Sequence, residues 1–186
     1  MSTATPETAT NSAGPAPKIV GPTDGHLADL GAIGARFMVG AEESGGGFSL
    51  VEHPMPPRSL AAPLHRHSRE DEYSFVIEGR MGALLGVDDL AAEVGDLVFK
   101  PRDQWHTFWN PTDEHTRILE IIAPGGFEGL FAELGEKLAG GAIDPAEVPA
   151  FFGHLSETYG IDFDPEATPA IAEEHGVWHP VFRPKP

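Results

Sequence analysis

Between residues 19 and 124, apolar side chains occur in short runs, several of which alternate with polar side chains. The runs are ARFMVG, GFSLVEH, EYSFVIEG, RMGALLGV, GDLVFKP, HTFWN and TRILEIIAP, and Gly, Pro, Asp and Asn separate them. Side chains two residues apart lie on the same side of a strand, and these separating residues favour tight turns. The pattern therefore predicts an all-β sandwich or barrel over residues 19–125.

A helical period replaces the strand pattern after Pro124. Apolar residues share one stripe at Phe127, Leu130, Phe131, Leu134 and Leu138. This spacing predicts a helix that ends near Gly140. A capping pattern at Asp144 predicts a second helix that ends before Gly160, although Pro149 leaves its start open.

Residues 161–186 are rich in Pro and acidic side chains, so we expect them to run over the surface, anchored by Phe163, Trp178 and Phe182. Together, residues 126–186 are expected to form a helical C-terminal extension packed on the barrel. Residues 1–18 contain almost no large apolar side chain and are expected to be a disordered tail, because such a segment cannot offset its ordering entropy by burial.

Composition and charge exclude several classes of protein. The chain has no cysteine, which excludes disulfides and thiolate metal sites. Its 29 acidic and 12 basic side chains give a formal charge of −17, which would repel nucleic acid and anionic membranes. The sequence shows neither a secretion signal nor a stretch of ~20 apolar residues that could span a membrane. We therefore expect a cytoplasmic protein whose partner is a small molecule.

Two segments carry the side chains of a possible metal site. The first, PLHRHSREDEYSFVIEG, contains His65, His67 and Glu72, and the second, GDLVFKPRDQWHTFWN, contains His106. In a strand, residues i and i+2 point to the same side, so the H-x-H pair presents two imidazoles to one face. The sequence therefore predicts that these four side chains converge on one metal ion.

Three imidazoles and one carboxylate restrict the metal and its chemistry. They suit one divalent transition metal (Fe, Mn, Ni, Co, Cu or Zn), whereas Ca and Mg prefer oxygen ligands. Four protein ligands leave positions for water, substrate or O2, which is typical of a catalytic site. Glu72 is the candidate general base, because a carboxylate that loosens from the metal can take a proton from a bound hydroxyl.

Strand alternation also predicts a pocket and an uncovered face. If Glu72 points inward, Ser74 and Val76 do too, and Phe108 shares a face with His106; we expect these three residues in the substrate pocket. The outward residues of the same strand are Tyr73, Phe75 and Ile77. Exposing them would forgo roughly 1.5–3 kcal/mol of burial free energy each, so the C-terminal helices or a second subunit should cover them. A homodimer is expected because two-fold assemblies are the commonest.

The remaining histidines do not fit the metal-site spacing. They are His26, His53, His115, His154, His175 and His179. Each is interpreted as an ordinary histidine at the surface or at the edge of the core.

The two metal-site segments resemble the motifs of the cupins, G-x5-H-x-H-x3,4-E-x6-G and G-x5-P-x-G-x2-H-x3-N. The first motif matches at His65, His67, Glu72 and Gly79, and the second at Gly95, Pro101, His106 and Asn110. Ser59 and Asp103 stand where the family has glycine. The resemblance covers roughly residues 48–124 and implies a cupin double-stranded β-helix, or jelly-roll barrel, with the metal in its mouth.

Among cupins, the chain resembles small bacterial proteins akin to quercetin 2,3-dioxygenase, through FSLVEHPMPP, EDEYSFVIEG and IIAPGGFEGLFAELG. This resemblance implies a flavonol-type substrate whose hydroxyl proton Glu72 removes before O2 cleaves the ring and CO is released. Relatives usually carry a bulky aromatic residue where this chain has Ser74, which leaves space for a planar ligand. Two alternatives stay open: a non-oxidative metal-dependent enzyme, such as an isomerase, and a module that binds a metal and a small molecule without turnover.

Overall fold

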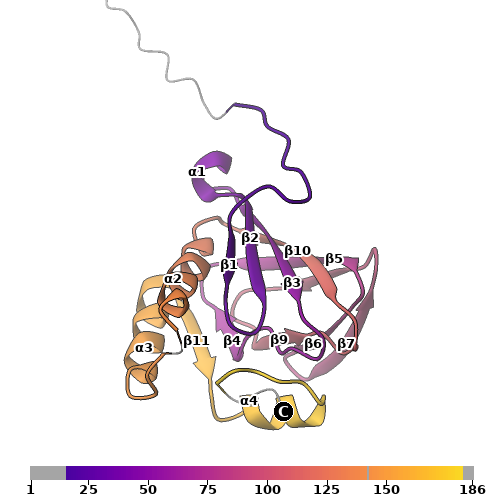
Figure 1. Cartoon of the computed structure of the whole chain (residues 1–186), viewed down its shortest axis with the longest axis vertical. Helices are drawn as coiled ribbons and strands as arrows, with labels where there is room; N and C mark the ends of the chain where they lie inside the picture. Colours follow the sequence, from indigo (N-terminus) through magenta and orange to yellow (C-terminus); the bar gives the residue numbers. More distant parts are fainter. Residues whose placement is uncertain (1–15, 142, 182–186) are drawn as a thin grey trace, which may run out of the picture.

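The computed structural model describes residues 16–141 and 143–181, and in this part of the chain two antiparallel sheets face each other (Figure 1). The six-stranded sheet has the order β1 (Leu27–Asp29), β2 (Gly34–Val39), β3 (Ser49–Met55), β10 (Thr116–Ala123), β5 (Asp71–Glu78) and β8 (Leu97–Lys100). The five-stranded sheet has the order β11 (Ile161–Asp164), β4 (Leu64–His67), β9 (His106–Trp109), β6 (Arg80–Leu85) and β7 (Asp88–Glu93). This arrangement confirms the all-β fold class.

Each of the seven predicted strand runs forms a strand, and alternation decides which side chains fill the barrel. Val51, Val76 and Ile118 are buried between the sheets, whereas Phe75, on the same strand as Val76, is 38 % exposed. β7 escapes the pattern because it is an edge strand on which Ala92 is the one buried residue. A short helix, α1 (Ala41–Ser44), was also not predicted.

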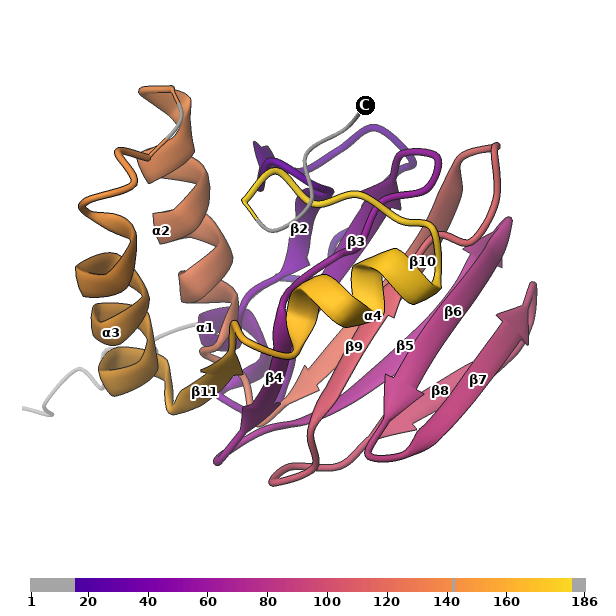
Figure 2. The ribbon, with the colours of Figure 1, turned by 90° about the horizontal axis from the view of Figure 1, so that it is seen from below.

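Two helices lie side by side next to the barrel, α2 (Glu128–Ala139) and α3 (Val148–Tyr159) (Figures 1 and 2). α2 approaches β1 closely at Gly135, where a Cβ atom would lie only 2.8 Å from the Cβ atom of Ala28. The absence of a side chain at Gly135 permits this approach. α3 begins later than its capping pattern predicts. Asp144 instead closes a turn, in which its backbone oxygen accepts a hydrogen bond from Glu147 N at 2.8 Å.

The described part of the segment expected to run over the surface, residues 161–181, contains a strand and a helix that were not predicted. β11 pairs antiparallel with β4, and α4 (Thr168–Glu174) crosses the outer face of the five-stranded sheet (Figure 2). Ala172 of α4 packs in one buried cluster with Trp109, on which His175 stacks at 4.0 Å. The order of this segment comes from these distant partners, which its own composition does not reveal. Phe182 and most of the predicted tail lie outside the described residues.

The outward face of β5 is not covered by helices. α2 and α3 contact β1 and β11, while Phe75, Phe99 and Ile121 stay between 37 and 48 % exposed. Of the two expected covers, the C-terminal helices therefore do not occupy this face. No helix in the described part of the chain is both long and apolar enough to span a membrane.

Candidate metal centre

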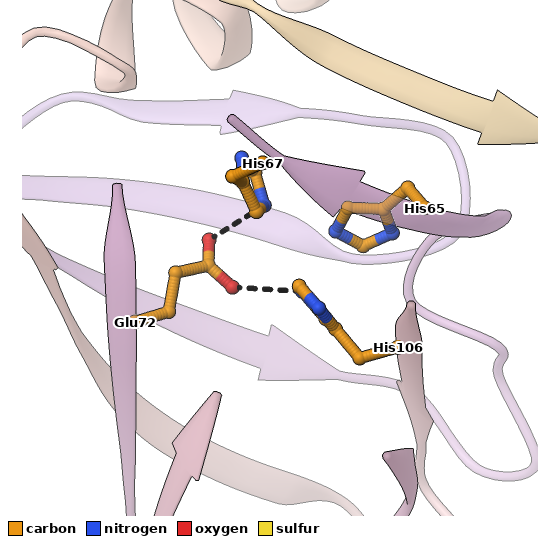
Figure 3. Close-up of side chains that lie close together, drawn as sticks. All are labelled: His65, His67, Glu72 and His106. Atoms are coloured by element: carbon orange, nitrogen blue, oxygen red, sulfur yellow. Dashed lines mark hydrogen bonds and ion pairs between the residues drawn. The ribbon is translucent and has the colours of Figure 1, made fainter. Parts of the chain in front are cut away.

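The structure brings the four predicted side chains together from both sheets (Figure 3). His65 and His67 point inward from β4, and His106, the register partner of His65, points inward from the neighbouring strand β9. Glu72 reaches them from β5 in the opposite sheet. One potential ligand atom from each residue lies within 4.8 Å of the others, and all four residues are buried.

Backbone carbonyls fix how two of these rings are oriented. Nδ1 of His65 lies 2.7 Å from the carbonyl oxygen of Pro63, and Nδ1 of His106 lies 2.9 Å from that of Gln104. A carbonyl oxygen only accepts hydrogen bonds, so both Nδ1 atoms carry the hydrogen. In a neutral ring the lone pair is then on Nε2, which is the arrangement that metal-binding histidines adopt.

The atoms in the centre are predominantly acceptors. Glu72 Oε1 lies 3.3 Å from Nε2 of His67, and Glu72 Oε2 lies 3.2 Å from Nε2 of His106. Neither ring nitrogen of the buried His67 has a hydrogen-bond partner among the described residues. Burial lowers the pKa of His67 to about 4 and that of His65 well below its ordinary value, so both rings are neutral at neutral pH. Lone pairs converging on one point fit a divalent transition metal.

A buried lysine stands behind the carboxylate. Lys100 Nζ lies 2.8 Å from Glu72 Oε2 and 2.5 Å from Glu120 Oε1, and all three side chains are buried. Burial alone would lower the pKa of Lys100, but Glu120 and Glu72 together raise it. Burial alone would likewise raise the pKa of Glu72, but the Lys100 ammonium group holds it well below its ordinary value. Both groups are therefore charged at neutral pH.

An apolar cavity of about 780 Å³ opens beside this centre. Its walls include His65 and Glu72 at the metal centre, Phe108 of the barrel, Phe131 of α2 and Leu155 of α3. The volume falls within the range of about 300–1,000 Å³ that is typical of small-molecule sites. The helices therefore help to enclose a space in which a largely apolar ligand can reach the metal centre.

Comparisons with known proteins agree with this geometry. Residues 52–122 match the family described as "Cupin domain". This segment of the chain is therefore a cupin domain. Two solved structures share the fold: KdgF from Halomonas sp. (TM-score 0.53, 14 % identity, 60 % of this chain and 96 % of that chain) and an RmlC-like cupin from Shewanella frigidimarina (TM-score 0.50, 14 % identity, 59 % and 93 %).

One curated relative is similar in sequence. The chain is 32 % identical over 120 residues to quercetin 2,3-dioxygenase from Aspergillus japonicus, an alignment that covers 61 % of this chain and 33 % of that protein. The chain thus spans about a third of the length of the curated relative it matches.

The cupin motif departs from glycine at Asp103, and the structure explains why this is tolerated. Asp103 has φ 64°, in the left-handed region that glycine favours and that Asp adopts more readily than most residues. Its backbone N–H donates to the carbonyl oxygen of His67 at 2.7 Å, which ties the turn to the metal-centre strand. Gly79, in contrast, cannot be replaced easily, because a Cβ there would lie 2.4 Å from Thr116 Oγ1.

The structure places the three residues predicted for the pocket in different surroundings. Phe108 lines the cavity, whereas Ser74 and Val76 point inward without lining it. Ser74 Oγ donates to Glu120 Oε1 at 2.8 Å, so Glu120 is the cavity-lining member of that pair. Val76 is fully buried in the core between the sheets.

Three polar residues near the centre did not emerge from the motifs: His53, Lys100 and Glu120. His53 and Glu120 line the cavity, although the sequence interpretation treats His53 as an ordinary histidine. Strand alternation could have indicated that these three side chains point inward. Each lies two residues after a buried apolar residue of its strand, respectively Val51, Val98 and Ile118. Charged or titratable groups at inward positions therefore mark the site beyond the motif.

The other histidines outside the motif differ in their surroundings. His26, His115 and His154 are exposed, and His175 stacks on Trp109. His179 is buried and lines the cavity, where burial lowers its pKa to about 4.

Proposed function

We propose that the chain is a metal-dependent dioxygenase of the quercetinase-like cupin type, which uses O2 to cleave a flavonol-like or related enol or phenolic compound. The observation that carries this proposal is the buried group of three histidines and Glu72 at one end of an apolar cavity. Similarity to quercetin 2,3-dioxygenase over 120 residues supports the same reaction class. For a flavonol, one O2 enters and one CO leaves in each turnover.

His65, His67, Glu72 and His106 would hold one divalent transition metal (Fe, Mn, Ni, Co, Cu or Zn). Nε2 of His65 and of His106 is available for this because Nδ1 of each ring donates to a backbone carbonyl. A bound ion of this kind would supply Lewis acidity toward oxygen atoms of the ligand, and each of these metals except Zn, which is not redox-active, would also offer a path for electrons to O2. Glu72 would accept the hydroxyl proton of the ligand, since its carboxylate lines the cavity in which the ligand would lie.

The cavity contributes by selecting and shielding the ligand. Phe108 and Phe127 offer aromatic surfaces beside the centre, and the ring of Phe127 lies 4.3 Å from that of His67. A planar aromatic ligand can pack against such rings, and its burial displaces water from the reacting atoms. We propose that residues 126–181 act as an extension of the barrel whose helices close this space.

The test is O2 uptake by protein loaded separately with each metal. Elemental analysis should find about one equivalent of metal per chain, and at least one metal form should bleach a flavonol while it consumes O2 and releases CO. The His65→Gln variant should lose both metal and activity, whereas His115→Gln, at an exposed position outside the cavity, should keep both.

Different outcomes separate the proposal from its alternatives. Turnover of a ligand that continues unchanged without O2 would indicate a non-oxidative, isomerase-type cupin enzyme. Metal and ligand binding without turnover in any metal form would indicate a binding module. A fully metal-loaded protein that neither consumes O2 nor bleaches a flavonol, beside an active control enzyme, would refute the dioxygenase.

We also propose that the chain forms a homodimer through its outer apolar face. This face consists of Tyr73, Phe75, Leu97, Phe99, Leu119 and Ile121. The residues form two rows across three strands, with Tyr73 between Phe99 and Ile121, and Phe75 between Leu97 and Leu119. A contiguous exposed apolar patch of this kind is typical of an interaction surface.

A further inference from the structure

A second pair of polar side chains lies inside the cavity, apart from the four residues of the metal centre. His53 of β3 and Glu120 of β10 are each 1 % exposed and both line the cavity. Nε2 of His53 lies 3.5 Å from Oε2 of Glu120. The strands are direct neighbours, and His53 pairs in register with Ile118, two residues from Glu120. The fold therefore holds the pair in place.

The neutral His53 ring carries its hydrogen on Nδ1, and the nitrogen that faces Glu120 is Nε2. Nδ1 lies 2.8 Å from the carbonyl oxygen of Gly34, which can only accept, so Nδ1 is the donor. Burial lowers the pKa of His53, in spite of the nearby Glu120 carboxylate, and the ring is neutral at neutral pH. The separation of 3.5 Å also exceeds the ~2.7–2.9 Å of a charge-assisted N–H···O bond. Nε2 is therefore an acceptor.

The facing oxygen of Glu120 is an acceptor as well. Oε1 already receives hydrogen bonds from Lys100 Nζ at 2.5 Å and from Ser74 Oγ at 2.8 Å. Oε2 receives none from the residues that the structure describes, and its polar neighbour is Nε2 of His53. Two buried acceptors thus face each other, and a group that donates hydrogen bonds would satisfy them.

The position of this pair relative to the metal centre is fixed by Lys100. Its ammonium group contacts Glu72 Oε2 and Glu120 Oε1 at the same time. These two carboxylate oxygens are therefore separated by no more than the sum of the two contact distances. Glu72, Glu120 and His53 line one continuous cavity. One small ligand can therefore reach the metal centre with one group and the pair with another.

We propose that His53 and Glu120 form an acceptor subsite that selects ligands with a hydrogen-bond donor, a hydroxyl or an amino group, close to the oxygen that meets the metal centre. This inference rests on the proposed function, because it concerns the ligand of the same cavity. It narrows the substrate class to aromatic compounds with two such groups. A ligand without the second donor leaves buried acceptors unpaired, which is a strong source of discrimination.

The experiment measures ligand binding without turnover, on Zn(II)-loaded protein in the absence of O2. The probes are 3-hydroxyflavones that carry hydrogen, hydroxyl, amino or methoxy at one further ring position, with each position tested in turn. At one position, the hydroxyl or amino compound should bind at least about tenfold more tightly than both the hydrogen and methoxy compounds, as expected for a hydrogen bond to a charged group. Equal binding within every set, or no binding of any probe, would overturn the proposal.

Two variants test the residues themselves. His53→Phe retains an aromatic ring against Phe131, which His53 contacts at 5.1 Å, but it removes the acceptor nitrogen. Glu120→Gln can turn an amide hydrogen toward His53 Nε2 and so occupy the subsite. Both should reduce the tenfold preference to less than about threefold. Circular dichroism identifies the variants that fold, and a preference that persists in the folded ones would overturn the assignment.

The matched controls are His115→Phe and Glu78→Gln, at exposed positions outside the cavity, and these should keep the full preference. The outcome is also separable from that of the proposed function. A donor preference in a protein that consumes no O2 would reject the dioxygenase and support the subsite. Flavonol cleavage with O2 but without any donor preference would support the dioxygenase and reject the subsite.

Discussion

Lys100 Nζ lies 2.8 Å from Glu72 Oε2, and both side chains are buried. The ammonium group therefore neutralises and orients the carboxylate that belongs to the metal centre. Because Lys100 also contacts Glu120, it is the cation between two buried anions. The inward position of Lys100 on β8 is thus explained by its partners on β5 and β10.

Replacing Lys100 with methionine should destabilise the metal-free protein strongly. The apolar side chain keeps most of the volume but leaves Glu72 and Glu120 without their cation, and breaking such a buried group costs roughly 3–5 kcal/mol. Urea unfolding of the metal-free protein measures this loss. Lys137→Met is the control, because Lys137 pairs with Glu147 at the surface, where a salt bridge contributes about 0–1 kcal/mol. Equal losses in the two variants would contradict the structural role of Lys100.

The Glu72→Gln variant separates catalysis from binding. The amide cannot accept the ligand's proton, so turnover should fall by about 100-fold or more if Glu72 is the general base. Metal content must be measured on the same sample, because Glu72 is also a candidate ligand. A variant that retains its metal and its full rate would show that Glu72 is not the base.

The grouping of the four candidate ligand side chains was predictable from sequence because its information is local. His65 and His67 are two residues apart on one strand, so alternation alone places both rings on one face, and the cupin motifs supply Glu72 and His106. The same rule placed Glu72 and Phe75 on opposite faces, as the structure confirms.

The features that escaped prediction depend on distant partners. β11 is only four residues long and exists because the edge of β4 is free to pair with it. Lys100 and Glu120 are residue types usually found at the surface. The free-energy cost of burying their charges is offset because the two side chains contact each other. The cavity depends on how α2 and α3 pack, which a helical stripe does not specify.

Acid should destabilise the metal-free protein. His67 has a pKa of about 4 in the folded chain against 6.5 ordinarily, so between these values the unfolded chain binds a proton that the folded chain does not. The free energy of unfolding therefore falls as pH is lowered from about 6.5 toward 4. At about 1.4 kcal/mol per pH unit, His67 alone contributes up to roughly 3 kcal/mol. His179, also at about 4, acts in the same direction.

One group opposes this dependence. Burial raises the pKa of Glu70 to about 7. The folded chain therefore keeps a proton that the unfolded chain loses, and this group lowers the free energy of unfolding as pH rises from 4.5 toward 7. The histidines should outweigh it, because His65 and His53 also have lowered pKa values. Urea unfolding with a chelator at pH 7, 6 and 5 measures the slope. His67→Gln should flatten it and the exposed His115→Gln should not; an unchanged slope in His67→Gln would contradict the assignment.

Metal binding should stabilise the folded chain, because the centre exists only when both sheets are assembled. The thermal midpoint of the protein should rise with added transition metal, and the rise should be lost in His106→Gln. His175→Gln is the control, since that ring stacks on Trp109 outside the centre. A midpoint that rises equally in both variants would place the metal elsewhere.

The outer apolar face should govern assembly. Phe75 is 38 % exposed at the centre of this face, so Phe75→Glu should keep the fold while it places a charge in the proposed interface, where an unpaired charge is costly. Sedimentation velocity should show that the wild-type chain is a dimer and the variant a monomer. Val87→Glu is the control, because Val87 is apolar and 93 % exposed but lies in the turn between β6 and β7. A monomeric wild type, or a Phe75→Glu variant that remains dimeric, would exclude this face as the interface.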